Sequence, residues 1–201
     1  MGVIEDAVAA IRAGQPIVLP ADTVYGLATT PHDRDAALRL YRLKDRPKSV
    51  PAAILARDLD TLFECVPELS DRERTIARAL LPGPYTLVLP NPAQRFPWLT
   101  AARPETIGVR VCTLPDPSRK VLEQVGVVMA TSANLHGQPD PRRAEDVAES
   151  IRAGVAAIVD AGELPGVRST ILDFSGEEPE VVREGAAPGA EAIERALAAI
   201  A

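Results

Sequence analysis

Apolar residues along the chain follow two spacings, one typical of helices and one typical of buried strands. From Val3 to Ile11 they recur at helical spacing, and Gly14 then ends the run, which predicts an amphipathic helix. Elsewhere, short and nearly unbroken apolar runs lie between turn residues, as in buried strands. These runs predict strands over residues 16–20, 52–56, 85–90, 106–112, 125–130, 155–162, 169–174 and 180–182.

Capping residues mark where further helices begin. Asp33 suits the cap position of a helix, and Ser70 with Glu73 has the reciprocal pattern of a capping box. Asp140 followed by Pro141 marks another helix start. The predicted helices cover residues 33–44, 68–83, 140–154 and those from Ala190 onward.

The order of these elements favours an α/β fold. Helices and strands alternate through most of the chain, which predicts a sheet covered by helices. The later strands follow one another closely, so some of them must pair antiparallel. Because the 201 residues contain no internal repeat and no clear linker, we expect a single domain over residues 1–201. Its architecture would be a twisted, mixed parallel and antiparallel sheet flanked by helices.

Composition narrows the classes of protein. The net charge of −6 argues against a protein that coats nucleic acid through its overall charge, although it allows a local basic patch. Cys65 and Cys112 lie far apart and outside any Cys-x-x-Cys pattern, so neither a disulfide framework nor a structural zinc site is indicated. No apolar run is long enough to span a bilayer, and the first residues lack the basic start of an export signal. We therefore expect a soluble, cytoplasmic protein without a membrane partner.

One segment concentrates positive charge in this acidic chain. Residues 42–48 contain Arg42, Lys44, Arg46 and Lys48, and the proline after Arg46 favours extended backbone. In an extended segment, residues two apart share a side, so three of these cations could converge on one polyanion such as phosphate. The alternative is a solvated basic turn at the end of a helix.

Polar side chains also follow several predicted strands. Thr131, Ser132 and Asn134 come directly after a buried strand, where ligands of α/β sheets commonly bind, although an ordinary polar turn would have the same composition. Arg110 lies inside a strand, where its charge needs either a partner or a sheet face open to water. The sequence contains no Walker loop, no dinucleotide fingerprint and no Gly-x-Ser-x-Gly motif.

Several blocks in one order resemble the YrdC-like family, the threonylcarbamoyl-AMP synthases. The resemblance runs through LPADTVYGLA, LYRLKDRPKSVP, LLPGPYTLVLP, TIGVRV, ATSANLHGQP, RSTILDF and VVREG, and so covers nearly the whole chain. It implies a YrdC-like fold with a positively charged central cleft. The implied nucleotidyltransferase activity condenses ATP, L-threonine and bicarbonate or CO2 into threonylcarbamoyl-AMP and pyrophosphate. The family acts in tRNA modification, making threonylcarbamoyladenosine. Mg²⁺ would arrive on the ATP, and downstream threonylcarbamoyl-transfer proteins and tRNA would be indirect partners.

The resemblance also implies roles for particular residues. Lys44 and Arg46 match the Lys-x-Arg pair that meets the nucleotide phosphates, and they would be the catalytic cations. The expected ATP-binding residues are Lys44, Arg46, Lys48, Thr106, Ser132, Asn134 and Arg183. The expected threonine-binding residues are Arg110, Ser169 and Ala130. No metal-ligating residue is expected.

The chain departs from the family pattern at a few positions. Ala21 replaces a threonine that commonly contacts the substrate amino acid, and Asp140 stands where some members have a small neutral residue near ATP. Two alternatives therefore remain beside the synthase. One is a non-catalytic protein that binds tRNA or double-stranded RNA in a basic cleft of the same scaffold. The other is a sister enzyme that adenylates or carbamoylates a different amine.

Overall fold

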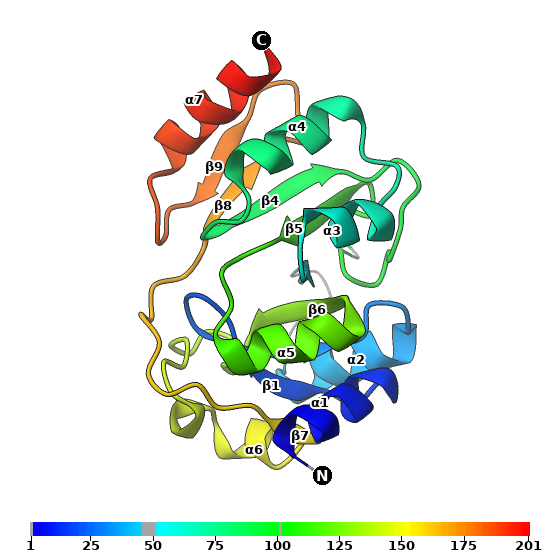
Figure 1. Ribbon diagram of the computed structural model, residues 1–201, viewed down its shortest axis with the longest axis vertical. Coiled ribbons are helices and arrows are strands. Elements are labelled where there is room, and N and C mark those ends of the chain that lie inside the picture. Colours follow the sequence, from blue (N-terminus) through cyan, green and yellow to red (C-terminus); the bar gives the residue numbers. More distant parts are fainter. Residues whose placement is uncertain (1, 46–50, 101) are drawn as a thin grey trace.

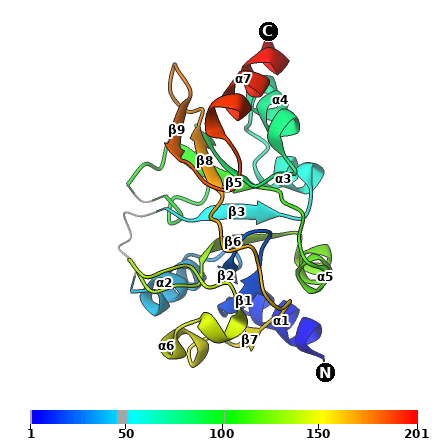
Figure 2. The same cartoon turned by 90° about the vertical axis from the view of Figure 1, so that its left-hand side faces the viewer.

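Residues 2–45, 51–100 and 102–201 are described by the computed structural model. A single mixed sheet runs along the long axis of the molecule, and helices flank it (Figures 1 and 2). The strands are β1 (Ile17–Pro20), β2 (Tyr25–Thr29), β3 (Ala53–Ala56), β4 (Tyr85–Pro90), β5 (Thr106–Arg110), β6 (Val127–Ser132), β7 (Ala157–Ile158), β8 (Thr170–Asp173) and β9 (Glu180–Arg183). The helices are α1 (Val3–Arg12), α2 (Arg34–Leu43), α3 (Leu59–Cys65), α4 (Asp71–Leu80), α5 (Asp116–Val125), α6 (Glu149–Arg152) and α7 (Gly189–Ile200).

The sheet has the strand order β7-β1-β2-β6-β3-β5-β4-β8-β9. Its pairs β7–β1, β3–β5 and β4–β8 are parallel, and the other neighbouring strands pair antiparallel. The predicted mixed α/β sheet is therefore confirmed. Strand β6 reaches the middle of the sheet from a distant part of the sequence, so segments far apart in the chain meet there.

Both faces of strand β1 are buried, which explains its unbroken apolar run. Ile17 and Leu19 share one core cluster with residues of α1 and α5, whereas Val18, which points to the opposite face, belongs to the larger cluster that includes α2 residues. Figure 2 shows α1 and α5 on one side of the sheet and α2 on the other. A strand enclosed by helices in this way has no solvent face and hence no polar alternation.

Two predicted caps have the expected geometry. The carboxylate of Asp33 accepts a hydrogen bond from the backbone N–H of Asp35 at 2.8 Å, at the start of α2. Ser70 and Glu73 form the predicted capping box of α4, with the backbone N–H of Ser70 donating to the Glu73 carboxylate at 2.9 Å. These short-range signals were sufficient to place both helix starts.

The helix predicted over residues 140–154 is wrong. The structure has a short 3₁₀ turn at Ala144–Asp146 and only one helical turn, α6, from Glu149 to Arg152. The Asp140 carboxylate binds the side chain of Arg168 instead of capping a helix, and the carbonyl of Pro141 accepts a hydrogen bond from the N–H of Tyr25. Contacts to distant parts of the chain thus replace the local helical hydrogen bonds.

Other elements differ from the prediction in extent or were missed. The strand predicted over residues 155–162 is reduced to the two residues of β7. Strand β2 and helices α3 and α5 were not predicted, although α3 begins at Asp58, whose carboxylate accepts the N–H of Thr61 at 2.7 Å. Because β2 begins directly after a polar turn and contains a glycine, its sequence resembles a loop.

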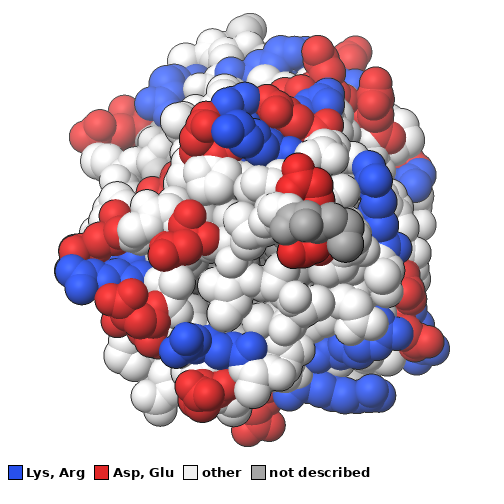
Figure 3. All heavy atoms as spheres, turned by 60° about the horizontal axis from the view of Figure 1, so that its bottom comes forward, with Lys and Arg blue, Asp and Glu red and all other residues white. Residues whose placement is uncertain are grey.

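The surface is mixed in charge where Figure 3 shows it. On this face Lys and Arg lie among Asp and Glu, so it has no broad area of a single charge. Within the described ranges, no helix is both long enough and apolar enough to cross a membrane.

The cost of removing core packing can be measured at Leu87 in β4, which is fully buried. Replacing Leu87 with alanine should lower the free energy of unfolding by about 2–5 kcal/mol, because the lost contacts leave a cavity. The same change at Leu197 of α7, which is 39% exposed, is the matched control and should cost much less. Urea denaturation of both variants measures the difference, and equal losses would contradict the assignment of β4 to the core.

Candidate functional site

A cavity of about 320 Å³ lies over the central strands of the sheet. Its floor is a row of small residues that face one another across four neighbouring strands. Ala28 of β2 pairs with Ala130 of β6, Ala130 with Ala53 of β3, and Ala53 with Gly108 of β5, and all four line the cavity. Directly opposed residues point to the same face of a sheet. Because none of the four carries a side chain beyond Cβ, the sheet is hollow here and has room for a ligand.

Strand alternation carries the predicted residues onto the same face. Thr106, Gly108 and Arg110 are two residues apart in β5, and all three line the cavity. The same spacing places Ser132 beside Ala130 on β6, and Ser132 also lines the cavity. Two residues predicted for ATP and two predicted for threonine are therefore brought to one surface.

Gly26 lies on this surface as well, whereas Tyr25 points away from it. A Cβ at Gly26 would come within 3.1 Å of the carbonyl oxygen of Thr131, so a side chain there would crowd the neighbouring strand. The Tyr25 hydroxyl donates to the carboxylate of Asp160 at 2.6 Å. Burial, together with this hydrogen bond, raises the pKa of Tyr25 to about 12. Tyr25 therefore supports the site by anchoring the segment after β7.

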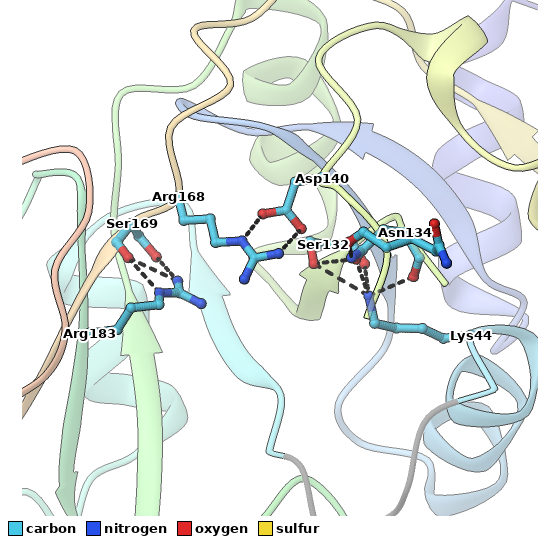
Figure 4. A network of polar contacts seen from close by, with 8 residues as sticks. Lys44, Ser132, Asn134, Asp140, Arg168, Ser169 and Arg183 are labelled. Carbon is cyan, nitrogen blue, oxygen red and sulfur yellow. Dashed lines mark hydrogen bonds and ion pairs between the residues drawn. The ribbon is translucent and has the colours of Figure 1, made fainter. Parts of the chain in front are cut away.

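Lys44 lies beneath the loop that follows β6. Only 2% of the residue is exposed, and its ammonium group donates to the carbonyl of Asn134 at 2.8 Å and to Ser132 Oγ at 3.3 Å. It also binds the carbonyl of Ser132 and the side-chain oxygen of Asn134 (Figure 4). Lys44 thus fixes Ser132 and Asn134 and adds a positive charge under them. Neither Lys44 nor Asn134 is among the residues that line the cavity.

Arg110 has a buried acidic partner that sequence reasoning did not assign. Its Nη2 donates to Asp22 Oδ1 at 2.7 Å, and both side chains are only 13% exposed. Arg110 Nε is buried without a hydrogen-bond partner in the described part of the chain. The partner comes from the segment that joins β1 to β2, directly after Ala21, which lines the cavity. The alternative of an arginine on a water-exposed face is therefore wrong.

Arg183 lines the cavity from β9, the strand at one edge of the sheet. Its Nη2 donates to the carbonyl of Ser169 at 2.8 Å and, more weakly, to Ser169 Oγ at 3.4 Å. Ser169 Oγ in turn lies 2.9 Å from the hydroxyl of Thr86. Burial lowers the pKa of the Arg183 guanidinium, and the nearby charges of Arg168 and Arg110 lower it further. The group remains a cation at neutral pH, because an arginine pKa begins far above it.

Two more ion pairs line the cavity, and neither was predicted. Arg103 donates to Asp173 at 2.9 Å, and Arg168 binds Asp140 through two nitrogens. Burial acts to raise the pKa of Asp173, but hydrogen bonds from Ser175 and the contact with Arg103 outweigh it and hold that pKa below its usual value. The described lining therefore includes four arginines and two aspartates.

Part of the predicted site cannot be compared. Arg46 and Lys48 lie outside the described residues, so the positive charge expected for the whole cleft stays a prediction. The structure brings six of the predicted residues to the cavity lining: Thr106, Arg110, Ala130, Ser132, Ser169 and Arg183. The residues that were missed share one property, which is that a partner distant in sequence defines their position. Within the described ranges, no group of three His, Cys, Asp or Glu side chains could hold a metal ion.

Fold and cavity define an α/β protein with a cavity over the central strands of a mixed sheet. The chain belongs to the Sua5/YciO/YrdC family, because the model of that family, described as telomere recombination, matches residues 9–185. The predicted YrdC-like fold is thereby confirmed.

Curated relatives from three organisms carry the name threonylcarbamoyl-AMP synthase. The protein of Bacillus subtilis (strain 168) is 33% identical over 184 residues, which cover 90% of this chain and 53% of that protein. The protein of Pyrococcus abyssi is 31% identical over 94% of this chain and 56% of its own length. This chain therefore spans about half the length of both relatives. A relative from Xanthomonas campestris pv. campestris (strain B100) is 31% identical over 82% of this chain and 88% of its own length.

Solved structures show the same fold. P. abyssi Sua5 complexed with L-threonine superposes with a TM-score of 0.85 at 30% identity, covering 96% of this chain and 56% of that one. E. coli YciO superposes with a TM-score of 0.81 at 27% identity, covering 92% and 90% of the two chains.

The buried ion pair can be tested through stability. Replacing Asp22 with alanine should lower the free energy of unfolding by about 3 kcal/mol, because Arg110 would keep a largely buried charge without its partner. Asp116→Ala is the control, since it removes an exposed carboxylate paired with Arg119 on α5 and should cost about 1 kcal/mol or less. Equal losses in chemical denaturation would show that the Asp22–Arg110 pair is as well hydrated as a surface pair.

Proposed function

We propose that this protein is an L-threonylcarbamoyladenylate synthase. It would condense ATP, L-threonine and bicarbonate or CO2 into threonylcarbamoyl-AMP and pyrophosphate, as a nucleotidyltransferase in tRNA modification. The observation that carries the proposal is that Arg110 of β5, Ser132 of β6 and Arg183 of β9 all line one cavity. The names of the curated relatives and the L-threonine in the P. abyssi Sua5 complex support the same assignment.

The threonine would occupy the part of the cavity near Arg110. An arginine guanidinium matches a carboxylate, and Arg110 lines the cavity while Asp22 holds its Nη2 in place. Ala130 leaves space on the cavity floor, and Ser169, directly before β8, would offer its hydroxyl. Ala21 adds no hydroxyl here, so selectivity for threonine over other amino acids would rest on the remaining contacts.

The triphosphate would lie between Arg183 and the loop that follows Ser132 at the end of β6. Thr106, Ser132 and Asn134 complete the proposed ATP site, with Lys44 beneath the loop and Arg46 and Lys48 as its further cations. Arg183 is held by a neutral serine, which leaves its charge uncompensated by that partner. Mg²⁺ would enter with the ATP phosphates and partly neutralise them.

The reaction needs no protein nucleophile. The threonine amine adds to CO2 and loses a proton, giving a carbamate. A carbamate oxygen then attacks the α-phosphorus of ATP, and the bond to the β-phosphate oxygen breaks, so pyrophosphate leaves with the electron pair. The protein's part is to hold two anions close together, to stabilise charge on the phosphoryl oxygens and to keep water from the mixed anhydride. The proposed cations for this task are Arg46 and Lys44, and Lys44 would act from beneath the loop after β6 by holding Ser132 and Asn134 in place.

The structure gives less support to the two alternatives. An RNA-binding scaffold would favour a continuous basic face, whereas the described cavity lining includes Asp140 and Asp173 beside its four arginines. A sister enzyme with another amine substrate would use the same phosphate site, and only Ala21 suggests this alternative.

The single sheet shared by all the strands also supports one domain over residues 1–201.

Pyrophosphate release from ATP, with Mg²⁺ and bicarbonate, tests the proposal. Release should depend on L-threonine, because threonine supplies the amine that becomes the nucleophile. Release with another amino acid but not with L-threonine would favour the sister enzyme, and no release with any amine would favour the binding protein.

A variant of Arg183 connects this activity to the cavity. Arg183→Gln should lower the rate of pyrophosphate release about 100-fold, since one charge-stabilising group is removed. Arg119→Gln, on the exposed face of α5, is the matched control and should leave the rate unchanged. Equal rates in the two variants would place the reaction elsewhere.

A further inference from the structure

The ion pair between Arg168 and Asp140 bridges the cavity. Asp140 follows β6 and Arg168 precedes β8, and three strands lie between these two in the sheet. Strands that far apart are separated by about 19 Å at the usual spacing of neighbouring strands. The two side chains nevertheless meet, and both residues line the cavity.

The pair leaves one side of the guanidinium group available. Arg168 binds the two Asp140 oxygens through Nε and Nη2, the latter at 3.2 Å. Its Nη1 has no hydrogen-bond acceptor among the described residues. In Figure 4 this nitrogen points into the gap between Arg183 and Lys44. The Arg168 side chain is 47% exposed, so a ligand can reach it, whereas the Asp140 side chain is only 4% exposed.

The local structure fixes this arrangement. The carbonyl of Arg168 accepts a hydrogen bond from the N–H of Ala186 at 2.8 Å, which ties its backbone to the segment after Arg183. A bidentate contact with a buried carboxylate then sets the orientation of the guanidinium plane. The group is therefore held in place before any ligand binds, which lowers the entropic cost of binding.

The positive charges of Arg168 and Arg183 favour the binding of a polyanion. Arg168 and Arg183 lie close enough for their charges to interact, and Asp140 compensates only part of the two. An anion with several oxygens could bridge Arg168 Nη1 and the Arg183 guanidinium, and phosphate groups match arginine donors in this way. A buried carboxylate facing the same cavity would repel such an anion if Arg168 did not pair with it.

We propose that Arg168 is a further phosphate-binding residue, which contacts the triphosphate of ATP, and that Asp140 is a positioning residue that orients it. The inference rests on the proposed function, because it takes ATP as the ligand of this cavity. It adds a cation that neither the family resemblance nor the sequence motifs assigned.

Binding of Mg-ATP and of pyrophosphate, measured by calorimetry, tests the proposal. Arg168→Gln should weaken both affinities about tenfold, as expected for the loss of a hydrogen bond to a charged group. L-threonine affinity should stay within about twofold, because threonine's proposed carboxylate partner is Arg110. Asp140→Asn should weaken ATP binding by a smaller factor, and Asp140→Glu should restore part of it. Melting temperatures check that each variant is folded.

The double variant Asp140→Asn/Arg168→Gln separates binding from mere charge neutralisation. If Arg168 binds phosphate, the double variant stays about tenfold weaker than the wild type. If Arg168 only neutralises Asp140, removing both charges restores wild-type affinity, and the proposal is overturned. The exposed pair Arg143–Glu163, which does not line the cavity, provides matched controls through Arg143→Gln and Glu163→Gln.

Failure of this inference is distinguishable from failure of the proposed function. A wild type that releases pyrophosphate with L-threonine, beside an Arg168→Gln variant of unchanged ATP affinity, overturns the inference alone. A wild type that binds ATP without turning over threonine overturns the synthase assignment, while the comparison of the variants still decides the role of Arg168. A wild type that binds no ATP overturns both.

Discussion

The site depends on one constraint of strand register, namely the row of small residues across the middle of the sheet. Ala28, Ala130, Ala53 and Gly108 must face one another for the cavity to exist. A slip of one residue in any of these strands would turn the small side chains to the other face and fill the cavity with larger ones. The helices on both faces enforce the register, because they bury both sets of side chains of strands such as β1. Core packing and ligand space are thus two results of the same pairing.

Charge is arranged around this row in compensated pairs. Three of the four arginines that line the cavity, Arg103, Arg110 and Arg168, bind a carboxylate, whereas Arg183 is held by Ser169. Pairing keeps the cations in fixed orientations, although it also reduces the net charge that a ligand meets. A polyanion therefore gains from geometry as much as from attraction, since the donors need little rearrangement when it binds.

Local signals in the sequence predicted the parts of the structure that local interactions determine. The caps at Asp33 and Ser70 require only neighbouring backbone groups, and both predictions were correct. Asp140 has the same local pattern, but a partner 28 residues away takes its carboxylate, and the predicted helix does not form. A cap residue gives no indication of such competition when the sequence is read alone.

The candidate site shows the same division. Alternation within β5 allowed Thr106 and Arg110 to be placed on a strand, and the family motifs singled them out. Ser132 was expected directly after a strand, whereas it is the last residue of β6. Asp22 and Arg168 acquire their positions from contacts with residues 88 and 28 positions away, which no spacing rule reveals. Lys44 was identified as a cation, but its burial beneath Ser132 and Asn134 follows only from the fold.

The central claim is that one cavity holds the nucleotide phosphates and the amino acid together. A crystal structure of the protein with L-threonine and a non-reactive ATP analogue, in which a methylene group replaces the α,β-bridging oxygen, tests it most directly. The account predicts phosphate oxygens at the Arg183 guanidinium and the threonine carboxylate at Arg110, above the Ala130 floor. Phosphates bound outside this cavity, or threonine bound on another face of the sheet, would contradict it.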